Sequence, residues 1–237
     1  MPFPIPKGRI IALNSPMSSH PIRKATAANI APVTFRSVQD YPDPDALIPD
    51  AFGWILAAGQ PYFDWLCGSR EAAERTVAMW MKQPSSEVFL QRMTFLQCGS
   101  QLAGGIIGLG GVELKRARIS DVNSYWKTLD VNSRGSLIGR LSQSLHAFAS
   151  VAEDEYYISK VGLARSFQGR GLAKVLVQQC LDQGTALGYS KFRADIQTEN
   201  KPSLRCSRLM GFEIFYTGQS LDGALRYHAL RYERKTK

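Results

Sequence analysis

The sequence predicts an α/β domain, because strand-like and helix-like stretches alternate along its second half. Residues 156–164 form a short, mostly apolar run, which is typical of a buried strand. A turn with two glycines follows, and then residues 172–187 carry apolar side chains every three or four positions. Residues 191–196, 202–210 and 212–216 then predict a strand, a helix and a strand. The 237 residues suffice for one sizeable core without a second full domain.

The first half of the chain begins with a segment unlike the rest. Residues 1–32 hold six prolines and no acidic residue, which favours an extended N-terminal arm over a helix or a secretory signal. The domain itself is expected over residues 33–237. Its early elements are a strand at 33–38, helices at 46–58 and 70–82, and strands at 87–98 and 101–112 joined by a Gly99–Ser100 hairpin turn.

A long connection separates these elements from the strand at 156–164. Residues 113–154 exceed what a simple connection needs, and apolar residues recur with helical spacing over 137–149. We therefore expect an extra helical insertion just before the fourth strand. Long connections often carry specificity, so this insertion is expected to border a binding site.

The most informative stretch is the glycine turn, Gln168-Gly169-Arg170-Gly171-Leu172-Ala173. A strand, a glycine turn and a helix in this order place unpaired backbone N–H groups at the start of the helix, where the helix dipole is positive. Such a position can bind a phosphate. Glycine allows positive φ and lets a ligand approach the backbone closely. An ordinary strand-to-helix turn is the alternative for these two glycines taken alone.

The residues after the turn make the pattern more specific. Gln168-x-x-Gly171-x-Ala173 is followed by Asn200 at the start of the next helix and by Gly211-Phe212 at the start of the following strand. In this order and spacing, residues 157–216 resemble the acetyl-CoA-binding core of the GNAT superfamily of N-acetyltransferases. The remainder resembles the family only in its order of elements. The resemblance implies a single GNAT-like domain, with a mixed, twisted sheet of about six to seven strands flanked by helices.

The resemblance also implies a site for acetyl-CoA as the acetyl donor. The turn residues would hold its pyrophosphate: Gln168, Gly169, Arg170, Gly171, Leu172 and Ala173. The strand around Val161 and Leu163 would splay from its neighbour and pair with the pantetheine arm, and Gly162 between them fits a bulge or a close backbone approach. An amide at Gly162 could also point at the thioester oxygen, and one preorganised donor to the oxyanion that forms when the amine attacks is typically worth roughly 3–4 kcal/mol. Asn200 and Ser203 would approach the pantetheine from the next helix.

Two catalytic candidates follow from the same resemblance. The family commonly has a Tyr four residues before the Gly-Phe pair to protonate the departing thiolate, and this chain has Ser207 there. Packing alone, or replacement by Cys206, Tyr216 or water, are the other interpretations. Glu155, at the start of the fourth strand, stands where many members keep a carboxylate that serves as base. Glu113 and Asp154 are alternatives, and for each an exposed strand-end carboxylate is the plainer interpretation.

Composition limits the partners. The net charge of +9 suggests an acidic partner, and six basic residues cluster in sequence around the expected CoA site: Lys160, Arg165, Arg170, Lys174, Lys201 and Arg205. Basic residues are otherwise spread along the chain, which argues against nucleic acid. The longest uncharged apolar run, 102–112, is too short to cross a membrane. The four cysteines show neither zinc nor disulfide spacing, so we expect no metal and reduced thiols in a cytoplasmic protein.

The sequence therefore predicts an N-acetyltransferase that acts on a primary amine, more readily a small molecule than a protein, by direct attack in a ternary complex. The protein would be a monomer or a homodimer. Three alternatives stay open: a CoA-binding regulatory module without catalysis, a lysine or N-terminal acetyltransferase of proteins or peptides, and a dinucleotide site in which Asp195 would hold a ribose. The dinucleotide site is disfavoured because Lys174 stands where its third glycine belongs.

Overall fold

The computed structural model describes residues 32–235, so the predicted N-terminal arm lies almost entirely outside the described residues. Seven strands form one mixed sheet in the order β1-β2-β3-β4-β5-β7-β6, and β4 and β5 are its parallel pair. The strands are β1 Val33–Arg36, β2 Met93–Cys98, β3 Gln101–Gly110, β4 Glu155–Leu163, β5 Lys191–Gln197, β6 Glu213–Gln219 and β7 Arg226–Glu233. The predicted α/β class with a mixed sheet is confirmed.

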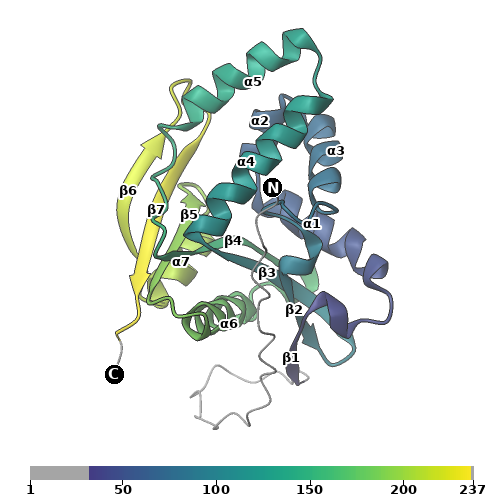
Figure 1. Cartoon of the computed structure of the whole chain (residues 1–237). Helices are drawn as coiled ribbons and strands as arrows, with labels where there is room; N and C mark the ends of the chain where they lie inside the picture. Colours follow the sequence, from purple (N-terminus) through teal and green to yellow (C-terminus); the bar gives the residue numbers. More distant parts are fainter. Residues whose placement is uncertain (1–31, 236–237) are drawn as a thin grey trace, which may run out of the picture. The chain divides into compact units, whose positions relative to one another are not determined.

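Helices cover both faces of this sheet (Figure 1). They are α1 Ile48–Ala58, α2 Tyr62–Cys67, α3 Arg70–Trp80, α4 Gly111–Thr128, α5 Val131–Ser144, α6 Leu172–Ala186 and α7 Lys201–Leu209. Helices α6 and α7 lie on one face, called here the α6–α7 face, and α1 to α4 lie on the other, called the α1–α4 face. Polar caps fix several starts; Asp130, for example, accepts hydrogen bonds from the amides of Asn132 and Ser133, both at 2.9 Å.

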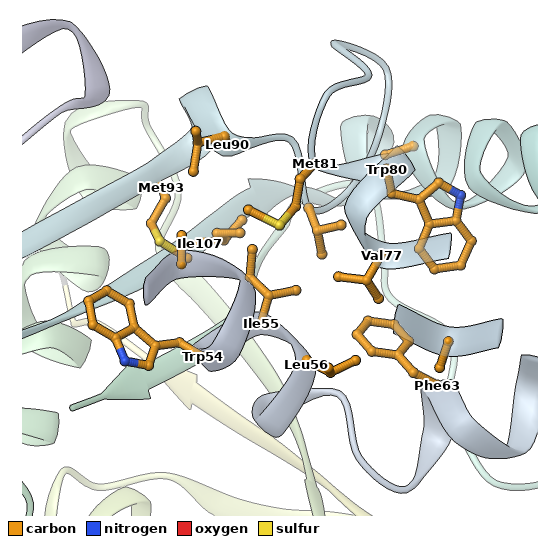
Figure 2. Close-up of a cluster of buried hydrophobic side chains, with 14 of the residues drawn as sticks. Trp54, Ile55, Leu56, Phe63, Val77, Trp80, Met81, Leu90, Met93 and Ile107 are labelled. Carbon is orange, nitrogen blue, oxygen red and sulfur yellow. The ribbon is translucent and has the colours of Figure 1, made fainter. Parts of the chain in front are cut away.

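Each face has its own hydrophobic core. On the α1–α4 face, Ile55, Val77 and Met93 pack together from two helices and a strand, as Figure 2 shows. On the α6–α7 face, Leu176 and other buried side chains of α6 pack against the sheet. Gly184 allows this close approach, because a Cβ there would lie 2.6 Å from the Phe192 ring.

Several predicted strand boundaries are wrong, and two of them change where candidate residues lie. The strand expected at 87–98 begins only at Met93, because Arg92 folds the preceding segment back by donating to the carbonyls of Ser86 (2.8 Å) and Pro84 (3.0 Å). The strand expected at 101–112 ends at Gly110, and helix α4 starts at Gly111. Glu113 therefore lies in the first turn of α4, ion-paired with Arg92, and does not end a strand.

The insertion before the fourth strand is larger than predicted. A helix was expected over 137–149, and α5 instead ends at Ser144, while α4 fills the first half of the connection. Helix α4 was not predicted, because one of its buried positions is the polar Asp121, which interrupts the apolar periodicity. Helix α2 is only six residues long and was also missed.

The buried Asp121 leads to a testable pH dependence. Burial raises the pKa of Asp121 to about 7 from 3.8, and the nearby Glu87 charge adds to the shift, although hydrogen bonds from Ser86 and the Glu87 amide oppose it. Between these two pH values the folded state keeps a proton that the unfolded state loses, so this group's contribution to stability falls as pH rises. We expect Asp121→Asn to remove that decline, measured as urea unfolding free energies from pH 4.5 to 7.5. An unchanged slope relative to wild type would contradict the shift.

Candidate functional site

The sheet opens between its two parallel strands. β4 and β5 pair only from Glu155 to Ile158 and from Lys191 to Ala194. Beyond these residues, 159–163 of β4 and 195–197 of β5 have no pairing with each other, so the two strands leave backbone groups free along both sides of the opening. This is the splay that the sequence resemblance implied, and it includes Val161 and Leu163.

A bulge lies where the opening begins. The pairing of β3 with β4 shifts between Ile107 and Gly108, so Ser159 is the extra residue of β4. The sequence suggested either a bulge or a close approach at Gly162, and the bulge is three residues earlier. Gly162 serves the close approach instead, because a Cβ there would overlap the side chain of Trp54 in α1.

The glycine turn presents free backbone donors. Gly169 and Gly171 have φ of 74° and 80°, and Lys174 donates to the Gly171 carbonyl at 3.1 Å to close the first turn of α6. Within residues 32–235, the amides of residues 169–173 donate to no protein acceptor. A Cβ on either glycine would meet nothing within 4 Å, so open space adjoins these donors. Helix-start amides beside open space fit a diphosphate, and the turn residues therefore fit the cofactor that the resemblance implies.

Two side chains support the turn. The Gln168 amide nitrogen donates to the Leu163 carbonyl at 3.1 Å, which ties the turn to the end of β4. The Arg170 guanidinium lies 5.4 Å from the centre of the Phe167 ring. Leu172 is buried in the α6–α7 core, and Ala173 is half-buried beside it. The turn thus rests on β4 and on the core of α6.

Helix α7 carries the other predicted contacts. The Asn200 side chain caps this helix by accepting from the Ser203 amide at 3.2 Å. Ser203 and Ser207 lie four residues apart and share one side of the helix with Asn200. Ser207 is half-buried, and its carbonyl accepts hydrogen bonds from the amides of Met210 and Phe212, both at 3.0 Å. The three polar residues form one short row beside α6.

The predicted carboxylates lie away from the opening. Glu155 is at the closed end of the β4–β5 pair, three residues before its last pair, which corresponds to about 10 Å along a strand. One of its oxygens accepts from the Ala152 amide at 2.8 Å and lies 3.5 Å from Arg193 Nε. Asp154 forms an exposed ion pair with Lys191 at 2.7 Å. Glu155 acts directly on a substrate only if that substrate reaches the closed end, so its role as base stays a prediction.

The six basic residues expected around CoA do not gather at one place. Lys160 points to the α1–α4 face, where it pairs with Glu87 at 3.0 Å. Lys201 and Arg205 line an open groove of about 570 Å³ on one flank of α7, together with Arg208 and His228. Arg165, Arg170 and Lys174 are exposed at the glycine turn or at the start of α6. The turn thus has fewer basic neighbours than the sequence suggested.

The α1–α4 face carries a charged network that sequence reasoning missed. Glu87 accepts from Ser159 of the bulge and from Lys160 (3.0 Å), and its other oxygen accepts from Arg118 of α4 at 3.1 Å. Burial would raise the pKa of Glu87, but Lys160 and Arg118 outweigh burial and hold that pKa well below its usual range. Glu87 is therefore ionised at neutral pH, and it links the bulge to α4. Nothing in the sequence distinguished Glu87 as a site residue, because Glu87 fell inside the strand expected at 87–98.

Asp195 lies directly beside the opening, and the sequence suggested it only as the ribose-binding residue of the disfavoured dinucleotide site. It is the first residue of β5 past the last β4–β5 pair, and its side chain is only 3% exposed. One oxygen accepts from the Tyr157 hydroxyl at 3.1 Å. The other lies 3.4 Å from Arg193 and makes no hydrogen bond. Burial raises the pKa of Asp195, although Arg193 and Arg118 oppose the shift.

A splayed parallel pair with free helix-start amides beside it is the arrangement of a GNAT-type acetyltransferase fold. The model of the Acetyltransferase (GNAT) family matches residues 109–212 of this chain, and the fold matches that of GNAT acetyltransferases. The match contains the strands that splay, the glycine turn, and helices α6 and α7.

Solved structures share this fold at low sequence identity. An N-acetyltransferase from Staphylococcus aureus Mu50 is 20% identical with a TM-score of 0.55, covering 78% of this chain and 96% of that one. A structure described only as an acetyltransferase is 14% identical (TM-score 0.53; 79% and 96% covered). An agmatine N-acetyltransferase is 11% identical (TM-score 0.52; 85% and 99% covered). A search of curated proteins found no match.

Among residues 32–235, no helix is long and apolar enough to span a membrane. The same residues contain no group of three or more His, Cys, Asp or Glu side chains placed to hold a metal ion. All four cysteines are free thiols.

Proposed function

We propose that this protein transfers an acetyl group from acetyl-CoA to a primary amine, by direct attack of the amine in a ternary complex. The observation that carries the proposal is the set of unengaged amides at residues 169–173, next to open space and to the β4–β5 opening. Acetyl-CoA supplies an activated acetyl thioester. The protein supplies positions for both reactants, which is a large part of the rate gain when two molecules must meet.

Each side of the opening has its own role in this proposal. The amides of the glycine turn hold the diphosphate, and the stretch of β4 around Val161 and Leu163, which β5 does not pair with, lies along the pantetheine arm. Asn200 and Ser203 contact that arm from α7. The amine enters from the α1–α4 face, where Ser159 and Asp195 border the opening.

A small acceptor is favoured because the insertion helps to cover the α1–α4 face. Helix α5 runs from the α2–α3 region toward the β6–β7 hairpin (Figure 1). The chain just after α5 is held at this hairpin by a hydrogen bond from the Gln219 amide to the His146 carbonyl at 3.0 Å. Trp65 of α2 reaches the same hairpin by donating to Asp222 at 2.8 Å. A covered face suits a small amine better than an extended peptide.

The test is release of free CoA from acetyl-CoA in the presence of a panel of small primary amines and lysine-containing peptides. We expect amine-dependent release, with an acetylated small amine identified by mass spectrometry. Tight CoA binding without turnover on any amine would favour the non-catalytic module. Turnover on peptides alone would assign a protein substrate.

Ser207 occupies the position of the family's acid, and its replacement tests whether its hydroxyl matters. We expect Ser207→Ala to change kcat less than about threefold, because the CoA thiol, with a pKa near about 8.5, leaves tolerably without full protonation. A loss within the range of a positioned acid, about 10²–10⁴-fold, would instead assign Ser207 a chemical role. Steady-state kinetics with saturating acetyl-CoA decides between them.

A further inference from the structure

A buried carboxylate oxygen without a hydrogen bond adjoins the opening in the sheet. Asp195 keeps one oxygen on the Tyr157 hydroxyl at 3.1 Å, and its second oxygen has no hydrogen-bond partner. Leaving such a group unsatisfied destabilises the folded protein, so an unsatisfied buried oxygen calls for a functional explanation. The β4–β5 ladder ends one residue before Asp195, at Ala194.

Arg193 is the cation beside this oxygen, but its hydrogen bonds go to other groups. Its two terminal nitrogens donate to the carbonyls of Leu230 (3.2 Å) and Ala149 (3.3 Å), and its plane lies 4.6 Å from the centre of the Phe215 ring. Its third nitrogen lies 3.5 Å from Glu155. Arg193 thus lowers the local negative charge without supplying the missing hydrogen bond to Asp195.

Aromatic side chains border the same region. Tyr227 projects from β7 on the same face as Asp195, since Asp195 pairs with Ala229 and the two residues of β7 are two apart. Phe148 packs on Tyr227 with ring centres 4.7 Å apart, and Tyr62 of α2 packs on Phe148 at 5.3 Å. Aromatic faces next to a carboxylate form a favourable environment for an organic cation.

We propose that Asp195 is the specificity determinant that binds the ammonium group of the acceptor amine, with the rings of Tyr62, Phe148 and Tyr227 as its walls. This inference rests on the proposed function and narrows it to amines that are cationic when they bind. The ammonium donates the hydrogen bond that the free Asp195 oxygen lacks, and it releases one proton to water before its nitrogen attacks the thioester. Tyr157 is a positioning residue, because its hydroxyl fixes the carboxylate from β4.

The experiment compares Asp195→Asn with wild type, and uses Asp182→Asn as a control in which an exposed carboxylate on α6 is lost. Binding to the CoA-saturated protein is measured by NMR titration for two probes, n-butylamine, which is cationic at pH 7, and n-butanol, its neutral analogue. We expect wild type to prefer the cation at least tenfold, and Asp195→Asn to lose this preference while its affinity for CoA is unchanged. The control keeps the preference.

Equal affinity of wild type for the two probes would overturn the inference, as would a preference that survives Asp195→Asn. Because binding is measured without turnover, a clear cation preference with no acetylation of any amine would leave Asp195 recognition standing and contradict the proposed function instead. If Asp195→Asn does not fold, Tyr157→Phe replaces it, and we expect a preference reduced at least threefold. An unreduced preference in that variant would contradict the positioning by Tyr157.

Discussion

Replacing Gly171 with valine is expected to raise the Michaelis constant for acetyl-CoA about 10- to 100-fold. Gly171 has a φ of 80°, a conformation that β-branched residues almost never adopt. The turn would have to change its backbone, and its amides would no longer point together at a diphosphate. A hydrogen bond to a charged group contributes about 1.5–3 kcal/mol, and 1.4 kcal/mol corresponds to a factor of ten.

The other end of the same helix offers a matched control. Gly188 also has positive φ, 93°, and a Cβ there would likewise meet nothing within 4 Å. Gly188→Val therefore introduces similar backbone strain, but lies far from the turn at the end of α6. We expect it to lower stability and to leave the Michaelis constant unchanged. Equal kinetic effects of the two variants would show that strain, and not diphosphate binding, explains the result.

The second large effect concerns Glu87, which contacts Ser159 in the bulge of β4. Glu87→Ala is expected to lower the free energy of unfolding by about 3–5 kcal/mol, the usual cost of removing one partner from a buried ion pair. The side chains of Glu87 and Lys160 are only 10% and 12% exposed, so the variant would leave Lys160 in a poorly solvated place without its anion. Chemical denaturation at pH 7 measures the change.

The exposed pair of Arg70 and Glu74 is the control for this loss. Their atoms are 2.8 Å apart, close to the distance in the Glu87 pair, but both side chains are more than 40% exposed. Surface pairs of this spacing on a helix contribute about 0.3–0.5 kcal/mol, so Glu74→Ala should have little effect. A small effect of Glu87→Ala as well would mean that the network is dispensable for stability.

The parts that the sequence predicted well are those in which local pattern and tertiary structure agree. The turn from Gln168 to Ala173 and helix α6 follow from glycine conformation and apolar periodicity, and both are present. Asn200 stands at the start of α7, as the resemblance implied, and the structure shows that its side chain caps this helix.

The acceptor side was poorly predicted, for a physical reason. Its polar residues act through contacts between distant segments: Glu87 meets Ser159 of β4, and Asp195 meets Tyr157. Neither pair has a local sequence signal, because strand pairing places Ser159, Tyr157 and Asp195, while Glu87 is placed by a turn before β2. The extent of α4 was missed for the same reason, since its buried Asp121 is held by the Glu87 amide and not by a local pattern.

The central claim is that amides of residues 169–173 bind the CoA diphosphate, and amide NMR tests it most directly. On titration with CoA, the N–H resonances of Gly169, Gly171 and Leu172 should show the largest shifts in the protein. Titration with pantetheine, which lacks the diphosphate, should leave these three resonances unshifted. Saturable CoA binding that leaves these three resonances in place, or no binding at all, would contradict the account.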